Sequence, residues 1–86
     1  MNDVQATAKI DRVSDELSKV YGQFHVNCRL SPSHAGMGEA SIRGAVVDER
    51  VFADVTGVPA QSTKVRTKEY GYSSFVRFKL EDVPQR

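Results

Sequence analysis

The stretch KVRTKEYGYSSFVRFK, residues 64–79, concentrates basic and aromatic side chains around a single glycine. Basic side chains neutralise phosphates or acidic protein surfaces, and exposed aromatic rings can stack on nucleic-acid bases. If the stretch forms two strands joined by a turn, alternation places most of its cations on one side of a β-hairpin. The candidate partner-binding residues are therefore Lys64, Arg66, Lys68, Tyr70, Tyr72, Phe75, Arg77 and Lys79.

Three interpretations of this basic hairpin stay open. Antiparallel sheets often carry Lys and Arg on their solvated side, where the charges also oppose edge-to-edge aggregation. The cations could instead face an acidic protein partner, or the phosphates of a nucleic acid. The pattern puts Phe75 on the same side as Arg77. An exposed Phe inside a basic patch favours an interaction site over a merely solvated surface.

The reactive side chains of this chain do not combine into a catalytic pattern. Cys28 and His25 are three residues apart on a predicted strand, so they point to opposite faces and cannot form a nucleophile–base pair. His34 could approach the thiol only if its loop folded back. The adjacent acids at 15–16 and 48–49 are typical of solvated surface charge rather than of two carboxyls converging in a cleft. We therefore expect no enzymatic activity.

Metal and cofactor sites are not predicted either. One cysteine and two histidines cannot supply the four nitrogen and sulfur ligands of a structural zinc site. The HAGMG run at residues 34–38 lacks the Lys-Ser or Lys-Thr pair that ends a phosphate-binding loop. Residues 53–66 have the outline of a helix-turn-helix, but Pro59 interrupts it. We expect no metal and no cofactor.

Length and composition indicate one globular domain that spans residues 1–86, since hydrophobic residues are 40% and charged residues 27% of the chain. The single cysteine excludes an internal disulfide and favours a reducing compartment. The N-terminus is charged throughout and has no apolar segment of a secretion signal. No apolar run approaches the roughly 20 residues needed to cross a bilayer. We expect a cytoplasmic protein that does not bind membranes.

The formal net charge of +1 hides a strong polarity along the chain. Residues 1–62 carry six basic and eight acidic side chains, whereas residues 63–80 carry five basic side chains and one acid. The last six residues add −1. The local basic excess therefore bears on the choice of partner more than the mean charge does.

An amphipathic helix is expected before Gly22, with Asn2 or Asp3 as its N-cap. Apolar residues recur on one side at spacings of three and four: Ala6, Ile10, Val13, Leu17 and Val20. The other side is expected to be solvated: Lys9, Arg12, Asp15, Glu16 and Lys19. This pattern predicts a helix that covers one face of a sheet.

Alternating apolar residues predict strands over residues 24–30, 40–47, 63–69 and 74–80. The side chains expected to face the core include Phe24, Val26, Cys28, Leu30, Val76, Phe78 and Leu80. Residues 31–39 are expected to be a flexible connection and a weaker candidate for binding than the hairpin. Residues 70–73 are expected to form the hairpin turn, and Gly44 to mark a bulge or a close backbone approach.

The segment DERVFADVTGVP, residues 48–59, fits two structures. It can form a short helix capped by Asp48 and ended by Gly57, or a strand in which Val51, Ala53 and Val55 alternate. The richness in Val, Phe and Thr favours the strand. The predicted architecture is α+β, with one N-terminal amphipathic helix packed on an antiparallel sheet of four to five strands.

These observations favour a small non-enzymatic binding protein. The first hypothesis is docking on a larger protein or nucleoprotein complex, which it modulates or inhibits. Size and the lack of catalytic residues are shared, by analogy, with virus- and mobile-element-encoded inhibitors of host defence such as anti-CRISPR proteins. The alternative is direct nucleic-acid binding by the basic hairpin. A homo-oligomer that uses the apolar side of the N-terminal helix is a third, weaker hypothesis.

Overall fold

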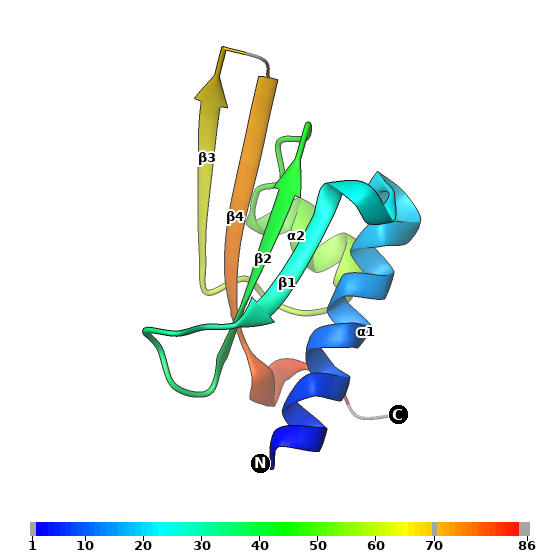
Figure 1. The fold of residues 1–86 in the computed structure, drawn as a ribbon, viewed down its shortest axis with the longest axis vertical. Coiled ribbons are helices and arrows are strands. Elements are labelled where there is room, and N and C mark those ends of the chain that lie inside the picture. Colours follow the sequence, from blue (N-terminus) through cyan, green and yellow to red (C-terminus); the bar gives the residue numbers. More distant parts are fainter. Residues whose placement is uncertain (1, 70, 85–86) are drawn as a thin grey trace.

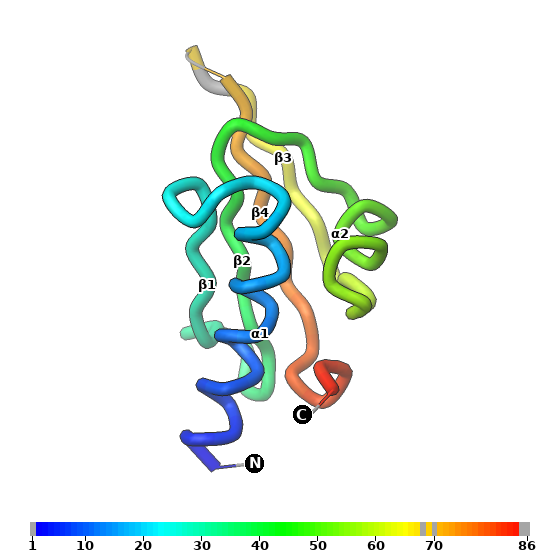
Figure 2. The backbone as a smooth tube through the Cα atoms, turned by 90° about the vertical axis from the view of Figure 1, so that its right-hand side faces the viewer, coloured from blue at the N-terminus to red at the C-terminus, as the bar shows by residue number. Residues whose placement is uncertain are grey.

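The computed structural model describes residues 2–69 and 71–84. Two helices lie on one side of a single four-stranded antiparallel sheet (Figures 1 and 2). The α+β architecture predicted from the sequence is therefore confirmed. The elements in chain order are α1 (Asp3–Tyr21), a 3-10 turn (Gln23–His25), β1 (Val26–Leu30), β2 (Met37–Arg43), α2 (Glu49–Thr56), β3 (Ser62–Lys68), β4 (Gly71–Lys79) and a second 3-10 turn (Leu80–Asp82).

The strands are ordered β1-β2-β4-β3, so β1 and β3 are the edges of the sheet. The connection from β2 through α2 to β3 skips over β4, which pairs with both of those strands. Together these elements form a split β-α-β unit with the last strand inserted between its two strands. The hairpin of β3 and β4 extends beyond the end of β2 (Figure 1).

Local signals fix both ends of α1. The Asn2 side chain accepts a hydrogen bond of 2.8 Å from the Gln5 N–H, and the Gln5 side chain accepts one of 3.2 Å from the Asn2 N–H. This reciprocal capping box satisfies two donors at the helix start. At the other end Gly22 adopts a φ of +91°, and its N–H donates to the Ser18 carbonyl at 2.8 Å. The predicted N-cap Asn2 and the stop at Gly22 are confirmed.

The predicted apolar side of α1 is buried over most of its length, but two positions were assigned wrongly. Val20 is 59% exposed, because the buried side of the helix continues from Leu17 to Tyr21, four residues on, which packs against the core in its place. Lys9, expected in solvent, is buried, and its Nζ donates to the Leu80 carbonyl at 3.0 Å. The remaining stripe packs in the core, where it is unavailable for the proposed homo-oligomer contact: Ala6, Ile10, Val13 and Leu17.

The strand favoured for residues 51–56 is wrong, because these residues form α2. The Asp48 side chain accepts a hydrogen bond from the Val51 N–H at 2.9 Å, which caps the helix start. Gly57 ends the helix in the left-handed conformation, with φ +72°. Phe52 and Thr56 lie one turn apart and are both buried. Burial of the Phe52 ring, 5.5 Å from that of Phe78, overrides the β-propensity of the segment.

The first two strands also differ from their predicted bounds. Phe24 lies in the 3-10 turn before β1 and is 79% exposed, and Leu30 at the strand end is 45% exposed, so neither is a core residue. β2 begins at Met37, within the predicted loop, and ends at Arg43. Period-two alternation marks which residues share a face, but not where the partner strand ends.

A bulge or a close backbone approach was expected at Gly44, but the tightest side-chain packing at a glycine is found at Gly38. A Cβ at Gly38 would lie 2.6 Å from both Ile10 Cδ1 and Phe78 Cζ, so only glycine lets α1 pack this close to the sheet. Gly44 has open space around it and a φ of +80°, and its N–H donates to the Tyr72 carbonyl at 2.7 Å. Gly44 therefore serves the turn that follows β2.

One hydrophobic core fills the space between the sheet and the two helices. Ser74 is fully buried at its edge, where its hydroxyl donates to the Ala45 carbonyl at 2.7 Å and accepts from the Val47 N–H at 2.8 Å. These bonds tie the β2–α2 connection to β4. The fully buried apolar side chains include Leu17, Ala40, Ile42, Val47, Phe52, Val58 and Phe78.

Candidate functional site

The side of the sheet that neither helix covers is the candidate site, and we call it the basic sheet face. Strand alternation and the register of the three strand pairs define which side chains lie on it. The residues of this face are Asn27, Arg29, Met37, Glu39, Ser41, Arg43, Ser62, Lys64, Arg66, Ser73, Phe75, Arg77 and Lys79.

The register brings residues that are far apart in the sequence into rows across the sheet. One row crosses all four strands and is formed by Arg29, Glu39, Arg77 and Ser62. The next row is formed by Asn27, Ser41, Phe75 and Lys64. Because side chains in a row are direct cross-strand neighbours, the first row forms an ionic cluster and the second places an aromatic ring beside a cation.

Glu39 sits at the centre of the ionic cluster and is only 7% exposed. Its Oε1 accepts a hydrogen bond from Arg29 Nε at 3.2 Å, and its Oε2 accepts from Ser31 Oγ at 3.1 Å and from Arg77 Nη2 at 3.3 Å. Burial raises the pKa of the Glu39 carboxyl, but the hydrogen bonds from Ser31, Arg77 and Arg29 outweigh it and the pKa lies below its usual value. The carboxylate therefore stays ionised and holds both guanidinium groups in place.

The basic sheet face is strongly positive while the rest of the molecule is negative. Six cations and one carboxylate give the face a formal charge of +5. Because the whole chain carries +1, the remainder, with Lys68 counted in it, carries −4. Many of the remaining acids belong to the two helices or their caps. An anion is therefore attracted to one side of the molecule and repelled by the other.

The face is hollowed rather than flat. A hollow of about 470 Å³, here called the β3–β4 hollow, is lined by Arg29, Glu39, Ser62, Thr63, Lys64, Arg66, Phe75 and Arg77. A smaller one of about 180 Å³ adjoins it over β1 and β2. Phe75, which is 39% exposed, lines both, as do Arg29 and Glu39. The ring is therefore accessible from the middle of a cationic surface.

The structure gathers five of the eight predicted residues on this face: Lys64, Arg66, Phe75, Arg77 and Lys79. Tyr72, expected among them, lies on the opposite side of the hairpin, because it pairs with Thr67 inside β4, which begins at Gly71, rather than forming the turn. Tyr70 lies outside the described residues. Lys68 belongs to β3 and pairs with Gly71, but its side chain also lies outside the described part of the chain.

Sequence reasoning missed the contribution of β1 and β2. Arg29, Glu39 and Arg43 belong to strands that precede the hairpin by 19 residues or more in the sequence. Alternation along residues 24–30 and 40–47 is the signal that could have marked Arg29 and Arg43 as outward residues of their strands. The missing information was the strand order, which places β2 beside β4 and so joins these residues to the hairpin.

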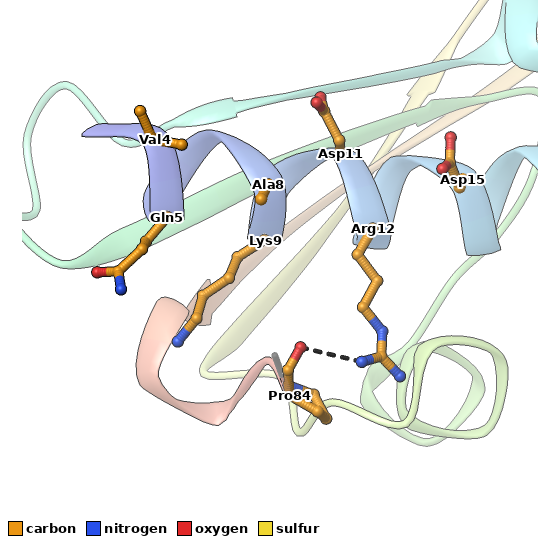
Figure 3. Close-up of a pocket in the computed structure, with 8 residues that line it drawn as sticks. All are labelled: Val4, Gln5, Ala8, Lys9, Asp11, Arg12, Asp15 and Pro84. Atoms are coloured by element: carbon orange, nitrogen blue, oxygen red, sulfur yellow. Dashed lines mark hydrogen bonds between the residues drawn. The ribbon is translucent and has the colours of Figure 1, made fainter. Parts of the chain in front are cut away.

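A third hollow, of about 440 Å³, lies away from the basic sheet face, between α1 and Pro84 (Figure 3). Figure 3 shows Lys9 and Arg12 reaching from α1 toward the C-terminal segment, while Asp11 and Asp15 point away from it. Arg12 Nη1 donates to the Pro84 carbonyl at 2.9 Å, as Lys9 does to Leu80. Both cations are therefore engaged with backbone carbonyls and tie the C-terminal segment to α1, so they are not free to bind a ligand in this hollow.

The reactive side chains lie apart from the basic sheet face. The pKa of the Cys28 thiol is raised to about 11, chiefly by burial; a hydrogen bond with Ser14 opposes the shift and nearby Asp11 adds to it. The thiol is therefore protonated at neutral pH and is a poor nucleophile. Within residues 2–69 and 71–84, no group of three or more His, Cys, Asp and Glu side chains could hold a metal ion. The helices in this part of the chain are too short or too polar to cross a membrane.

The chain was compared with protein-family models, curated proteins and solved structures, and none of them matches it.

Proposed function

We propose that this protein is a non-enzymatic nucleic-acid-binding protein that takes the phosphate backbone on the basic sheet face. The observation that carries the proposal is the formal charge of +5 on this face against −4 on the rest of the chain. A nucleic-acid strand carries a row of phosphates, so several cations of such a surface can each neutralise one of them at the same time. The acidic helix side of the molecule repels phosphates, so binding of the nucleic acid on that side is disfavoured.

The ion pairs of Glu39, the one carboxylate among the residues of the basic sheet face, also support a nucleic acid as the partner. Glu39 is bonded to Arg29 and Arg77 and is almost inaccessible, so it repels an incoming phosphate only weakly. Lys64, Arg66 and Arg43 are exposed on the same face. Their charges are spread over β2 and β3, which suits a ligand that runs across the sheet and contacts several cations in turn.

Phe75 supplies the contact that a purely electrostatic surface would lack. Proteins that bind single strands combine a cationic groove with aromatic side chains on which bases stack. The exposed side of a four-stranded sheet is a known platform for this type of recognition in RNA-binding domains. An exposed ring amid cations therefore favours nucleic acid over an acidic protein surface as the ligand of this face.

Fluorescence anisotropy with a labelled single strand of about 12 nucleotides tests the proposal. The double variant Lys64→Glu, Arg66→Glu should weaken binding at least about 100-fold and flatten the dependence on salt, by about 0.7 units of slope for each phosphate that is no longer neutralised. The matched control Lys19→Glu, Arg50→Glu changes the same charge on the helix side and should bind as wild type. Equal binding by both variants, or no binding by wild type at low salt, would contradict the proposal.

A second candidate function is docking on a larger protein or nucleoprotein complex that this protein modulates or inhibits. The observation that favours it lies on the other side of the hairpin, where Tyr72 is 51% and Val65 42% exposed. Aromatic and aliphatic side chains of this kind anchor protein interfaces, while charges steer the encounter. Inhibitors of host defence such as anti-CRISPR proteins belong to this functional class.

Purification of tagged protein from lysate, with and without nuclease, separates the two functions. Docking predicts a stoichiometric protein that survives nuclease and is absent with the variant Tyr72→Ser but present with Lys64→Glu, Arg66→Glu. Recovery of nucleic acid alone supports the first function. Either function fits a cytoplasmic location, which the unpaired Cys28 also supports.

A further inference from the structure

We infer that the β3–β4 hollow is a subsite for one nucleotide of a single strand, with the phosphate beside Arg29 and Arg77 and the base against Phe75. The inference rests on the proposed function and adds to it the unit that is recognised and the place where it binds. It is carried by three features of the hollow: pre-positioned guanidinium groups, a buried donor with no partner among the described residues, and a ring at a suitable spacing.

Glu39 pre-positions the cationic end of the subsite. It holds Arg29 and Arg77 from opposite sides, with N–O distances of 3.2 and 3.3 Å. Each guanidinium has five N–H donors, and the carboxylate uses only some of them, so donors remain for a phosphate. Because both side chains are already held, little rotamer entropy is lost when the phosphate binds. Ser62, the cross-strand neighbour of Arg77, adds a hydroxyl donor.

Arg77 also has an unsatisfied donor in this position. Its Nε is buried and finds no hydrogen-bond acceptor among the described residues. A buried guanidinium N–H without a partner is unfavourable, and native structures rarely keep one unless another group satisfies it. A phosphate oxygen in the hollow would let the guanidinium turn and pair both Nε and a terminal nitrogen in the bidentate geometry that Arg prefers.

Phe75 lies at the spacing that a nucleotide requires. It is two residues from Arg77 on β4 and on the same face, so the two side chains start roughly 7 Å apart. A sugar fits between a phosphate at one position and a base at the other. Lys64, directly opposite Phe75, and Arg66 beyond it continue the cationic path along β3 toward the next phosphate.

The geometry selects a single strand over a duplex. Phe75 can stack only on the flat side of a base, and in a duplex both sides are covered by neighbouring base pairs. A hollow of about 470 Å³ admits one unstacked base and its phosphate, not a double helix. The same charges without the ring would bind any polyanion without this preference.

Three probes of equal length separate phosphate contacts from base contacts. Wild-type protein is titrated with oligothymidine of about 12 nucleotides, with an abasic strand of the same length, and with the corresponding duplex. We expect the affinity for oligothymidine to be at least about ten times that for the abasic strand, because stacking of one base raises the affinity by a factor of this order. The duplex should bind no better than the abasic strand.

Two variants and one control assign the effect to the hollow. Phe75→Leu keeps the charge and should bind oligothymidine only as well as wild type binds the abasic strand. Lys64→Gln should weaken both single strands alike, by about three-fold or more, and lower the salt slope by about 0.7. Arg50→Gln removes one exposed charge from α2 and should change neither. Thermal unfolding of each variant confirms that weaker binding does not come from unfolding.

The outcomes distinguish the subsite from the proposed function. If wild type binds oligothymidine and the abasic strand equally, or if Phe75→Leu keeps the preference for oligothymidine, nucleic-acid binding stands and the nucleotide subsite is overturned. A duplex that binds more tightly than the single strand also overturns it. If none of the three probes binds at low salt, the subsite and the proposed function both fall.

Discussion

The two sides of β4 differ in what their side chains do, although they alternate along one strand. Phe78 points to the helices, is fully buried and packs on Phe52. Phe75, three residues earlier, points away from them and is 39% exposed among cations. The covered side stabilises the fold through packing, and the open side is free to carry charge and an exposed ring because no helix has to pack on it.

Adjacent residues of β2 show the same difference. Gly38 has no room for a methyl group because α1 and Phe78 press on it, whereas Glu39 faces outward and binds three polar side chains. The comparison teaches that changes on the covered side should alter stability, and changes on the open side should alter binding. Four predictions test how cleanly the two properties separate.

The largest expected effect is that of Phe78→Ala. Truncating a fully buried Phe leaves a cavity beside Phe52 and should lower the free energy of unfolding by about 3–5 kcal/mol. Phe75→Ala, the matched change on the open side, should lower it by about 1 kcal/mol or less, as its ring is already partly hydrated. Urea unfolding followed by circular dichroism measures both. Equal decreases would refute the separation of the two sides.

Gly38→Ala should have the next largest effect. The new methyl group would lie 2.6 Å from Ile10 Cδ1 and from Phe78 Cζ, so α1 must shift or the side chains must leave their preferred rotamers. Overpacking of this kind costs about 1–3 kcal/mol. The same urea titration measures the change, and affinity for the single strand, measured well below the unfolding midpoint, should not change. A variant as stable as wild type would show that α1 has room to accept the methyl group.

Glu39→Gln should change both stability and binding, because Glu39 lies on the open side of the sheet and its ion pairs also stabilise the fold. The pKa of its carboxyl is lowered in the folded state, so its ionisation stabilises the fold above the unfolded-state pKa near 4.3, and this contribution is lost as the pH falls through the folded-state value. The variant should therefore be less stable at neutral pH. The loss should be only about 1 kcal/mol, because the arginine partners are partly exposed and solvent screens their charges. At low pH the difference should vanish.

The same variant should bind the single strand no more tightly than wild type, although the face gains one unit of positive charge, because a neutral amide holds the guanidinium groups of Arg29 and Arg77 less firmly. Anisotropy at neutral pH, and thermal unfolding over a range of pH, measure the two effects. A stability difference that persists unchanged below about pH 3 would show that the Glu39 charge is not its source. Tighter binding would show that the added charge outweighs the positioning of Arg29 and Arg77.

The smallest expected effect is that of Arg66→Gln. Arg66 is exposed on β3 opposite Ser73, and its guanidinium makes no ion pair within residues 2–69 and 71–84. Stability should change by less than about 0.5 kcal/mol. The dependence of affinity on salt should fall by about 0.7 units of slope, the share of one phosphate contact. An unchanged slope would place Arg66 outside the contact surface.

Local patterns predicted much of the fold. The capping residue Asn2, the stop at Gly22 and the apolar stripe of α1 act over one or two turns and could be recognised from spacing alone. The strand favoured for residues 51–56 failed because intrinsic preference is weak beside packing: Phe52 is buried only if the segment coils over Phe78. Lys9 was placed in solvent because the sequence gives no sign of the carbonyl of Leu80 near its ammonium group.

The sequence by itself determined the basic character of the C-terminal hairpin and the alternation that puts Lys64, Arg66, Phe75, Arg77 and Lys79 on one side. These properties depend on residues a few positions apart. Only the tertiary structure decided that β2 lies beside β4, that Glu39 joins Arg29 to Arg77, and that the helices leave this face open. The physical reason is that strand order follows from burying the apolar side of the whole sheet, a condition that no single segment contains.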